Sequence, residues 1–162
     1  MLIPATDSRG GIGNALIITR HTVVNATHTD IITATDSWFN NVANVSPTLR
    51  AATMNTQVPP ARGSSTTAST GENTFMLPQP GIMGAGRAFS LSRVEAEEYF
   101  ATNADRAATG THNRWWPRAS PSISGINTTN FIGEGGHAST SGGNISESSS
   151  LGVRPAVWVS VN

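Results

Sequence analysis

Residues 153–161 close the chain with the sequence VRPAVWVSV, which has the pattern of a buried strand. Pro155 has no backbone N–H to donate, so we expect it at a sheet edge or near the start of the strand. Valines recur at period two and therefore share one face of an extended segment: Val153, Val157, Val159 and Val161. Such a strand is stable only against partners supplied by the rest of the chain.

The twin tryptophans are the expected neighbours of this strand, and a second buried strand is expected near the start of the chain. Residues 15–18 read ALII between glycine and arginine neighbours, which predicts a second buried strand. Trp115 and Trp116 are adjacent, and adjacent residues of a strand point to opposite faces. We expect Trp115 in the core. Trp116 either joins it there or is exposed and available to stack on a ligand.

The clearest local signal is a helix start near residue 92. Ser92 and Glu95 have the spacing of a capping box, in which each side chain takes the backbone N–H of the other residue. Leu91 and Ala96 occupy the hydrophobic-staple positions, so we expect a helix that runs to about Phe100 or Thr102.

Two further helices are expected earlier in the chain. Residues 36–45 carry Trp38, Val42 and Val45 at helical spacing, with Asp36 or Ser37 as cap. Ser46 and Pro47 then read as the N-cap and first residue of a short second helix, because a missing N–H does no harm at that position.

Two long stretches, 58–86 and 119–150, consist largely of Pro, Gly, Ser, Thr and Asn, a composition typical of loops. Interspersed apolar residues in the second stretch predict short strands between exposed loops. One part of it offers amide and hydroxyl groups beside an aromatic ring, which suits protein or glycan contact: Asn127, Thr128, Thr129, Asn130 and Phe131. The region 122–147 is either a binding site or a solvated loop, and the sequence leaves both open.

Composition excludes several kinds of chemistry. Charged residues make up 12% of the chain, against about 25% in typical domains. All ten basic residues are arginines and the net charge is zero, so Schiff-base chemistry and a polybasic nucleic-acid surface are not expected. The absence of cysteine removes thiol nucleophiles and cysteine-based zinc sites.

No membrane insertion is expected, because no apolar run is long enough to span a bilayer. The first residues lack the basic and apolar regions of a signal peptide. The chain is therefore expected to be cytoplasmic when made, a mature fragment, or a virion component released by lysis, and its expected final location is extracellular, at a cell surface or in a virion.

We expect no catalytic residues, no metal site and no cofactor. The four histidines are scattered without metal-ligand spacing, and each is interpreted as a surface or loop residue. Glu95, Glu97 and Glu98 are explained by capping and by a solvated helix face rather than by acid–base catalysis.

Three ordered blocks resemble a known family. They are residues 89–100 (FSLSRVEAEEYF) with 103–108 (NADRAA), residues 115–121 (WWPRASP), and residues 152–159 (GVRPAVWV). Together they resemble the bacterial and phage family called domain of unknown function 6273. Pro117 stands where that family usually has leucine, Ala119 is inserted or substituted, and Ser122 replaces a glycine, so the loop after Trp116 departs from the family pattern.

The resemblance implies a fold similar to C-type lectins, formylglycine-generating enzymes and the variable proteins of diversity-generating retroelements. We therefore expect one α+β domain over residues 1–162, with short helices around a small, mainly antiparallel sheet and long irregular loops. Arg118 and Arg154 lie at motif positions. A buried arginine must be paired or hydrogen-bonded, so both are expected to hold loop carbonyls near the terminal strand.

The first functional hypothesis is a non-catalytic recognition module that binds a protein or glycan at a cell or virion surface. The alternative is a structural subunit of a phage virion (a decoration, fibre or tail protein) or of a surface lattice. Homo-oligomers or larger assemblies are expected, and nucleic-acid partners are not. The composition, with few charges and many Thr, Ser and Asn residues, fits both hypotheses.

Overall fold

The computed structural model describes residues 2–3, 13–57, 79–84, 86, 88–110, 112–118, 128–129, 131–138, 145–146 and 149–161. The helical segments are short: η1 (His28–Asp30), α1 (Ile31–Asn40), α2 (Pro47–Ala52), α4 (Arg93–Tyr99) and α5 (Asn103–Arg106). The strands are β1 (Leu2–Ile3), β2 (Asn14–Ile18), β3 (His21–Thr22), β4 (Val24–Ala26), β5 (Met54–Gln57), β6 (Gln79–Met83), β7 (Phe89–Ser90), β8 (Thr109–Gly110), β9 (Thr128–Thr129), β10 (Ile145–Ser146), β11 (Leu151–Val153) and β12 (Pro155–Ser160). The fold is mixed, with a small sheet and short helices, in agreement with the α+β class expected from the sequence.

The terminal strand β12 lies inside an antiparallel sheet of order β1-β2-β12-β7. It pairs with β2 from Ala156 opposite Ile18 to Ser160 opposite Asn14. Pro155 is its first residue, as expected for a residue without an N–H, and its carbonyl accepts a hydrogen bond of 3.0 Å from the Thr19 amide. The expected strand at residues 15–18 is thus confirmed as β2, one residue longer at its start.

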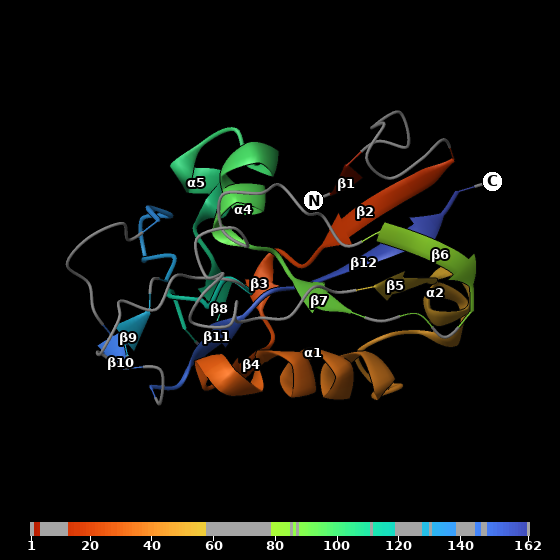
Figure 1. Cartoon of the computed structure of the whole chain (residues 1–162), viewed down its shortest axis with the longest axis horizontal. Helices are drawn as coiled ribbons and strands as arrows, with labels where there is room; N and C mark the ends of the chain where they lie inside the picture. Colours follow the sequence, from red (N-terminus) through yellow and green to blue (C-terminus); the bar gives the residue numbers. More distant parts are fainter. Residues whose placement is uncertain are drawn as a thin grey trace, which may run out of the picture.

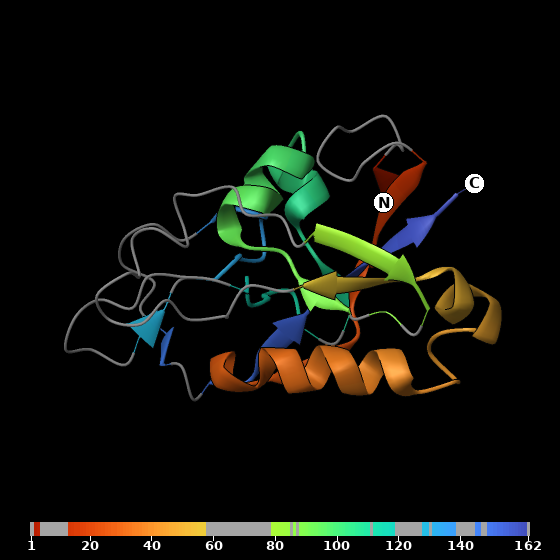
Figure 2. The same cartoon turned by 45° about the vertical axis from the view of Figure 1, so that its right-hand side comes forward.

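The sheet lies between two helical layers. Figures 1 and 2 show α4 and α5 on one side, α1 on the other, and the strands between them. β12 serves both layers, because Ala156 and Trp158 join the hydrophobic core beneath α4 while Val157 and Val159 join the core that contains Phe39 of α1. Alternation at period two therefore separates two buried faces rather than a buried face and an exposed face.

The twin tryptophans lie beside the end of the chain, as expected, but neither of them is exposed. Trp115 is 1% and Trp116 0% exposed. Trp115 belongs to the core beneath α4, whereas Trp116 packs with Val153 in a third cluster against the start of α1. The alternative that Trp116 is exposed and stacks on a ligand is therefore wrong. The two adjacent side chains point to opposite faces, but both faces are covered by other parts of the chain.

The helix expected over residues 36–45 begins five residues earlier and ends at Asn40. Its buried positions are Ile31, Thr35 and Phe39, and Val42 lies beyond the helix, 68% exposed. Thr35 is buried because its hydroxyl donates to the Ile31 carbonyl at 3.0 Å, which satisfies its polar group. Neither Asp36 nor Ser37 is a cap, since both lie inside the helix.

The other two helix starts agree with the sequence. The Ser46 hydroxyl accepts from the Leu49 amide at the start of α2, with Pro47 as first residue. The capping box at Ser92 and Glu95 has both hydrogen bonds, of 3.2 Å and 2.7 Å, and α4 ends at Tyr99. None of the described helices has both the length and the apolar character needed to cross a bilayer.

Part of the stretch expected to be loop is a strand, because residues 79–83 form β6 and pair with β5. The segment between these two strands, residues 58–78, lies outside the described residues. Strand β11 pairs with β4, and β3 pairs in parallel with β8. These two short ladders, together with α5, carry the pockets described below.

Gly152 explains how the strand β11 comes so close to its neighbours. A Cβ atom at this position would lie 2.3 Å from the Thr22 methyl group and 3.0 Å from the Arg114 carbonyl. The Gly152 amide donates to that carbonyl, and its own carbonyl accepts from the Trp116 amide, each at 3.0 Å. Only glycine fits between β3 and the tryptophan segment, so this residue fixes the position of Arg154, two residues later.

Candidate functional site

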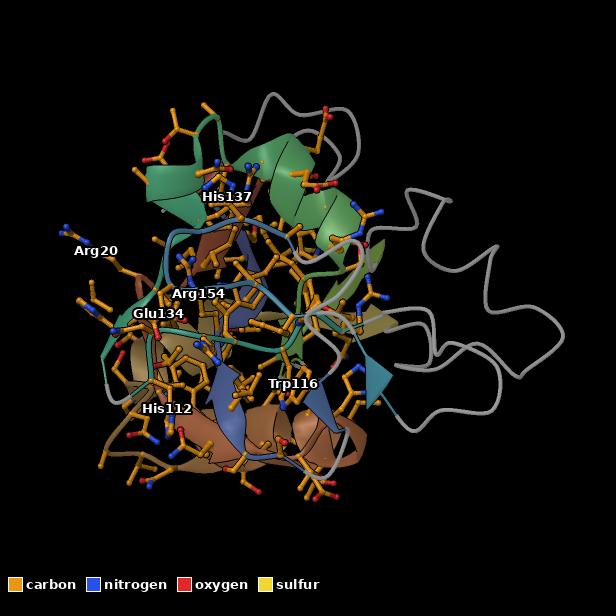
Figure 3. The ribbon with its side chains drawn as sticks, turned by 90° about the vertical axis from the view of Figure 1, so that its left-hand side faces the viewer. Arg20, His112, Trp116, Glu134, His137 and Arg154 are labelled. Carbon is orange, nitrogen blue, oxygen red and sulfur yellow. The ribbon has the colours of Figure 1, made fainter. Side chains whose placement is uncertain are left out.

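One face of the molecule carries a pocket with two arginines, which we call the arginine pocket. Its volume is about 350 Å³, and it is lined by Arg20, Phe100, Ala104, Asp105, Ala107, Thr109 and Arg154. Figure 3 looks onto this face, with Arg20 extending outward and Arg154 nearer the centre, between His137 and His112. The base of the pocket is buried and four of its lining residues are exposed, so it is an open site.

Arg154 forms the base of the arginine pocket and is only 2% exposed. Its Nε donates to the Thr19 carbonyl at 3.1 Å, and its Nη1 donates to the Arg106 carbonyl at 2.7 Å. The guanidinium carbon lies 4.7 Å from the Phe100 ring centroid and 5.3 Å from that of Trp115. Two carbonyls and two ring faces thus hold this cation, in the way expected of a buried arginine.

No carboxylate among the described residues pairs with Arg154. Its Nη2 has no acceptor among these residues either. Burial lowers the pKa of Arg154 to about 10, so the guanidinium remains charged at neutral pH. A buried charge that keeps a donor free beside a pocket favours the entry of an anionic group.

Arg106, the last residue of α5, joins the pocket wall to the rest of this face. Its guanidinium donates to the carbonyls of Gly136 at 3.0 Å and Phe100 at 3.2 Å, and to the side chain of Asn103. Its own carbonyl accepts from Trp115 Nε1 as well as from Arg154. The wall and the base of the pocket are therefore positioned by the same residue.

Gly136 allows the turn 133–137 to lie directly on α5. Its φ is +75°, and a Cβ there would lie 1.7 Å from the Asn103 carbonyl oxygen. His137 then contacts Asn103, whose Nδ2 lies 2.9 Å from the His137 Nδ1. The turn supports the wall of the arginine pocket from outside, and a side chain at position 136 would push the two segments apart.

A second pocket of about 420 Å³ follows Thr109 along the chain. It is lined by Gly110, His112, Asn113, Arg114, Glu134 and Leu151. Arg114 is already occupied here, since its Nε lies 3.5 Å from the Glu134 carboxylate and its guanidinium lies over the Phe131 ring at 5.6 Å. The arginine of this pocket therefore already has a carboxylate partner, whereas Arg154 in the first pocket has none among the described residues.

Arg118 is buried at the start of α4 and lines neither of these pockets. It is 3% exposed and forms an ion pair with Glu95, which is 1% exposed. Its Nε also donates to the Ser90 carbonyl at 3.1 Å, and Ser90 pairs with Pro155 at the start of β12. Arg118 therefore connects the capped end of α4 to the terminal strand.

The loop residues expected to bind a ligand are only partly described. Asn127 and Asn130 lie outside the described residues. Thr128 and Thr129 form β9 and pair with β10. Phe131 is half-buried and packs against the cluster around Trp116. Their assignment to ligand binding stays a prediction, except for Trp116, which is buried and donates its Nε1 hydrogen to the Ala26 carbonyl at 3.0 Å.

The histidines give one further correction. His28 is 1% exposed and meets the Trp116 ring edge-on at a centroid distance of 5.3 Å, so it is a core residue rather than a surface one. His21 and His137 are exposed and His112 is half-buried. Within the described ranges, no group of three or more His, Asp or Glu side chains is placed to hold a metal ion.

Sequence reasoning did not identify Arg20, Asp105, Arg106 or Thr109 as site residues. Arg20 and Arg154 are brought together by the fold from opposite ends of the chain, which no local pattern reveals. One signal was available: in a chain this poor in charge, each arginine that is not paired locally marks a position of interest. Searches for similar proteins add nothing here, because no protein-family model, curated protein or solved structure matches the chain.

Proposed function

We propose that this chain is a non-catalytic recognition domain on a C-type-lectin-like scaffold, which binds a ligand at a cell or virion surface. The observation that carries the proposal is the arginine pocket, where a buried cation forms the base of an open cavity and has no carboxylate partner among the described residues. The two carbonyls and two rings stabilise this cation without neutralising it, so a ligand that supplies an anion would gain a charge-assisted hydrogen bond here.

The scaffold supports a binding role because it is rigid beneath this face. Trp115, the terminal strand and α4 form one packed core, and the pocket residues are attached to it by hydrogen bonds of Arg106 and Arg154. Exposed polar loops on a rigid core are the usual arrangement of binding proteins. The small antiparallel sheet that contains β2 and β12 is also what the proposed lectin-like scaffold leads us to expect.

The test is a screen of the full chain against arrays of glycans and surface proteins. A variant with Arg20→Ala, the exposed arginine of the arginine pocket, serves as the comparison. We expect at least one ligand whose binding is lost in the variant. No ligand for the folded protein, together with a large discrete assembly in light scattering, would replace this proposal with the structural-subunit hypothesis.

A further inference from the structure

We infer that the arginine pocket binds a carboxylated sugar, a sialic or hexuronic acid residue at the end of a glycan. This inference rests on the proposed recognition function and names the ligand class. The structural basis is the meeting of Arg154, Arg20 and Asp105 around one cavity of about 350 Å³.

The two arginines supply the carboxylate-binding part of the site. Arg154 Nη2 is the nitrogen left for a ligand, since Nε and Nη1 are used by the carbonyls of Thr19 and Arg106. Arg20 is exposed at the rim and forms no ion pair with a described residue. One fixed guanidinium at the base and one adaptable guanidinium at the rim suit a single carboxylate.

Asp105 indicates that the ligand has hydrogen-bond donors as well as a carboxylate. Its Oδ2 accepts from the Thr102 hydroxyl at 2.8 Å, which fixes the side chain at the start of α5. The other oxygen, Oδ1, has no donor among the described residues. A dicarboxylate would be repelled here, whereas the hydroxyl groups of a sugar would donate to this oxygen.

The openness of the pocket favours the end of a longer chain over a free small molecule. Arg20, Ala104, Asp105 and Thr109 are all exposed, so a ligand rests against them without being enclosed. Small-molecule sites bury most of their ligand, commonly 70–90% of its surface. A volume of about 350 Å³ accommodates one sugar ring, and the rest of the glycan would extend into solvent.

A peptide carboxyl terminus is the other chain end that carries a carboxylate. Peptide recognition uses an open strand edge, an apolar groove or a nest of backbone N–H groups. The wall of this pocket instead consists of side chains from α5 and the residues after it, with alanines as its small apolar part. We therefore argue for the sugar acid and treat the peptide as an outcome of the test.

The test is titration calorimetry of the full chain with two acidic probes, sialyllactose and methyl glucuronide. Lactose and methyl glucoside are the neutral counterparts, and a short peptide with a free carboxyl terminus is the third arm. We expect an acidic probe to bind and its neutral counterpart to bind at least about tenfold more weakly, as for a lost charged hydrogen bond.

Arg20→Ala should weaken that binding by about tenfold, and Arg20→Lys should restore part of it. Because Arg20 is exposed, neither change disturbs the core. The matched control is Arg114→Ala, an exposed arginine of the neighbouring pocket, which should leave the affinity unchanged. Asp105→Asn should weaken sugar binding less than Arg20→Ala does.

Three results would overturn the inference. They are equal binding of acidic and neutral sugars, binding of the peptide in place of the sugar acids, and an affinity unaffected by Arg20→Ala. If the array screen nevertheless finds another ligand for this face, the recognition function stands and only the ligand class is wrong. If no probe and no array ligand binds the folded chain, both proposals fail.

Discussion

Two arginines are buried to the same degree, yet their surroundings differ. Arg118 is 3% exposed and Arg154 is 2% exposed. Arg118 is neutralised by Glu95 within the core, whereas Arg154 is held by carbonyls and aromatic rings at the base of an open pocket. We propose that the chain uses the same side chain for two purposes. Arg118 completes the structure, whereas Arg154, which forms no ion pair with a described residue, binds an anion.

The largest expected effect is the loss of stability when the Arg118–Glu95 ion pair is broken. Glu95→Gln keeps an oxygen for the Ser92 amide but removes the carboxylate that neutralises the buried Arg118 charge. We expect the free energy of unfolding, measured in urea, to fall by about 3–5 kcal/mol.

Glu97→Gln is the matched control in the same helix. Glu97 forms a surface ion pair with Arg93 at 2.8 Å, so its loss should lower the stability by less than about 1 kcal/mol. If the two substitutions lowered the free energy of unfolding equally, the buried Arg118–Glu95 pair would be no more important for stability than a surface ion pair.

A smaller loss of stability is expected when Arg154, at the base of the arginine pocket, is replaced. Arg154→Met removes a charge that has no carboxylate partner within the described part of the chain, so no described carboxylate loses its counter-ion. The Thr19 carbonyl loses a donor, while the Arg106 carbonyl keeps the hydrogen bond from Trp115. We expect the free energy of unfolding to fall by about 1–3 kcal/mol.

This loss should be smaller than that of Glu95→Gln under the same urea conditions. A loss as large as that caused by Glu95→Gln would mean that Arg154 is a structural residue of the same kind as Arg118. The distinction between the two arginines would then be lost.

The smallest expected effects come from the N-caps of the two helices, α4 and α5. Ser92 caps α4 above the paired arginine, and Thr102 caps α5 at the pocket, each through a 3.2 Å hydrogen bond. Ser92→Ala and Thr102→Ala should each lower the stability by about 1 kcal/mol in thermal or urea unfolding.

Only Thr102→Ala should also weaken sugar-acid binding, by a few-fold, because Asp105 loses the hydroxyl that orients it. A few-fold change is what a lost neutral hydrogen bond gives. If Ser92→Ala weakened binding equally, the effect of Thr102→Ala could not be attributed to the orientation of Asp105 in the pocket.

The sequence predicted those parts of the fold that are encoded locally. The capping box at Ser92 and the Ser46-Pro47 helix start depend on residues three or fewer positions apart, and both are present. The terminal strand beside the tryptophans was also predicted, since the order of the motifs and the pattern of apolar residues indicated the contact.

Parts that depend on tertiary packing were not predicted. The start of α1 was missed because its buried face includes Thr35, a polar residue that satisfies its own hydroxyl within the helix. The sequence left Trp116 open between core and surface, because alternation says nothing about whether a second layer covers the opposite face. The arginine pocket joins Arg20 to Arg154, and only the folded chain shows that they meet.

The central claim is that Arg154, and not Arg118, is available to a ligand. The most direct measurement is a side-chain spectrum of the arginine Nε–H groups by nitrogen-15 NMR during titration with sialyllactose and methyl glucuronide. We predict that the signals of Arg154 and Arg20 shift with the probe that binds, while that of Arg118, enclosed with Glu95, does not move. Unchanged Arg154 signals at saturating concentrations of both probes, or equal shifts of Arg118 and Arg154, would contradict the account.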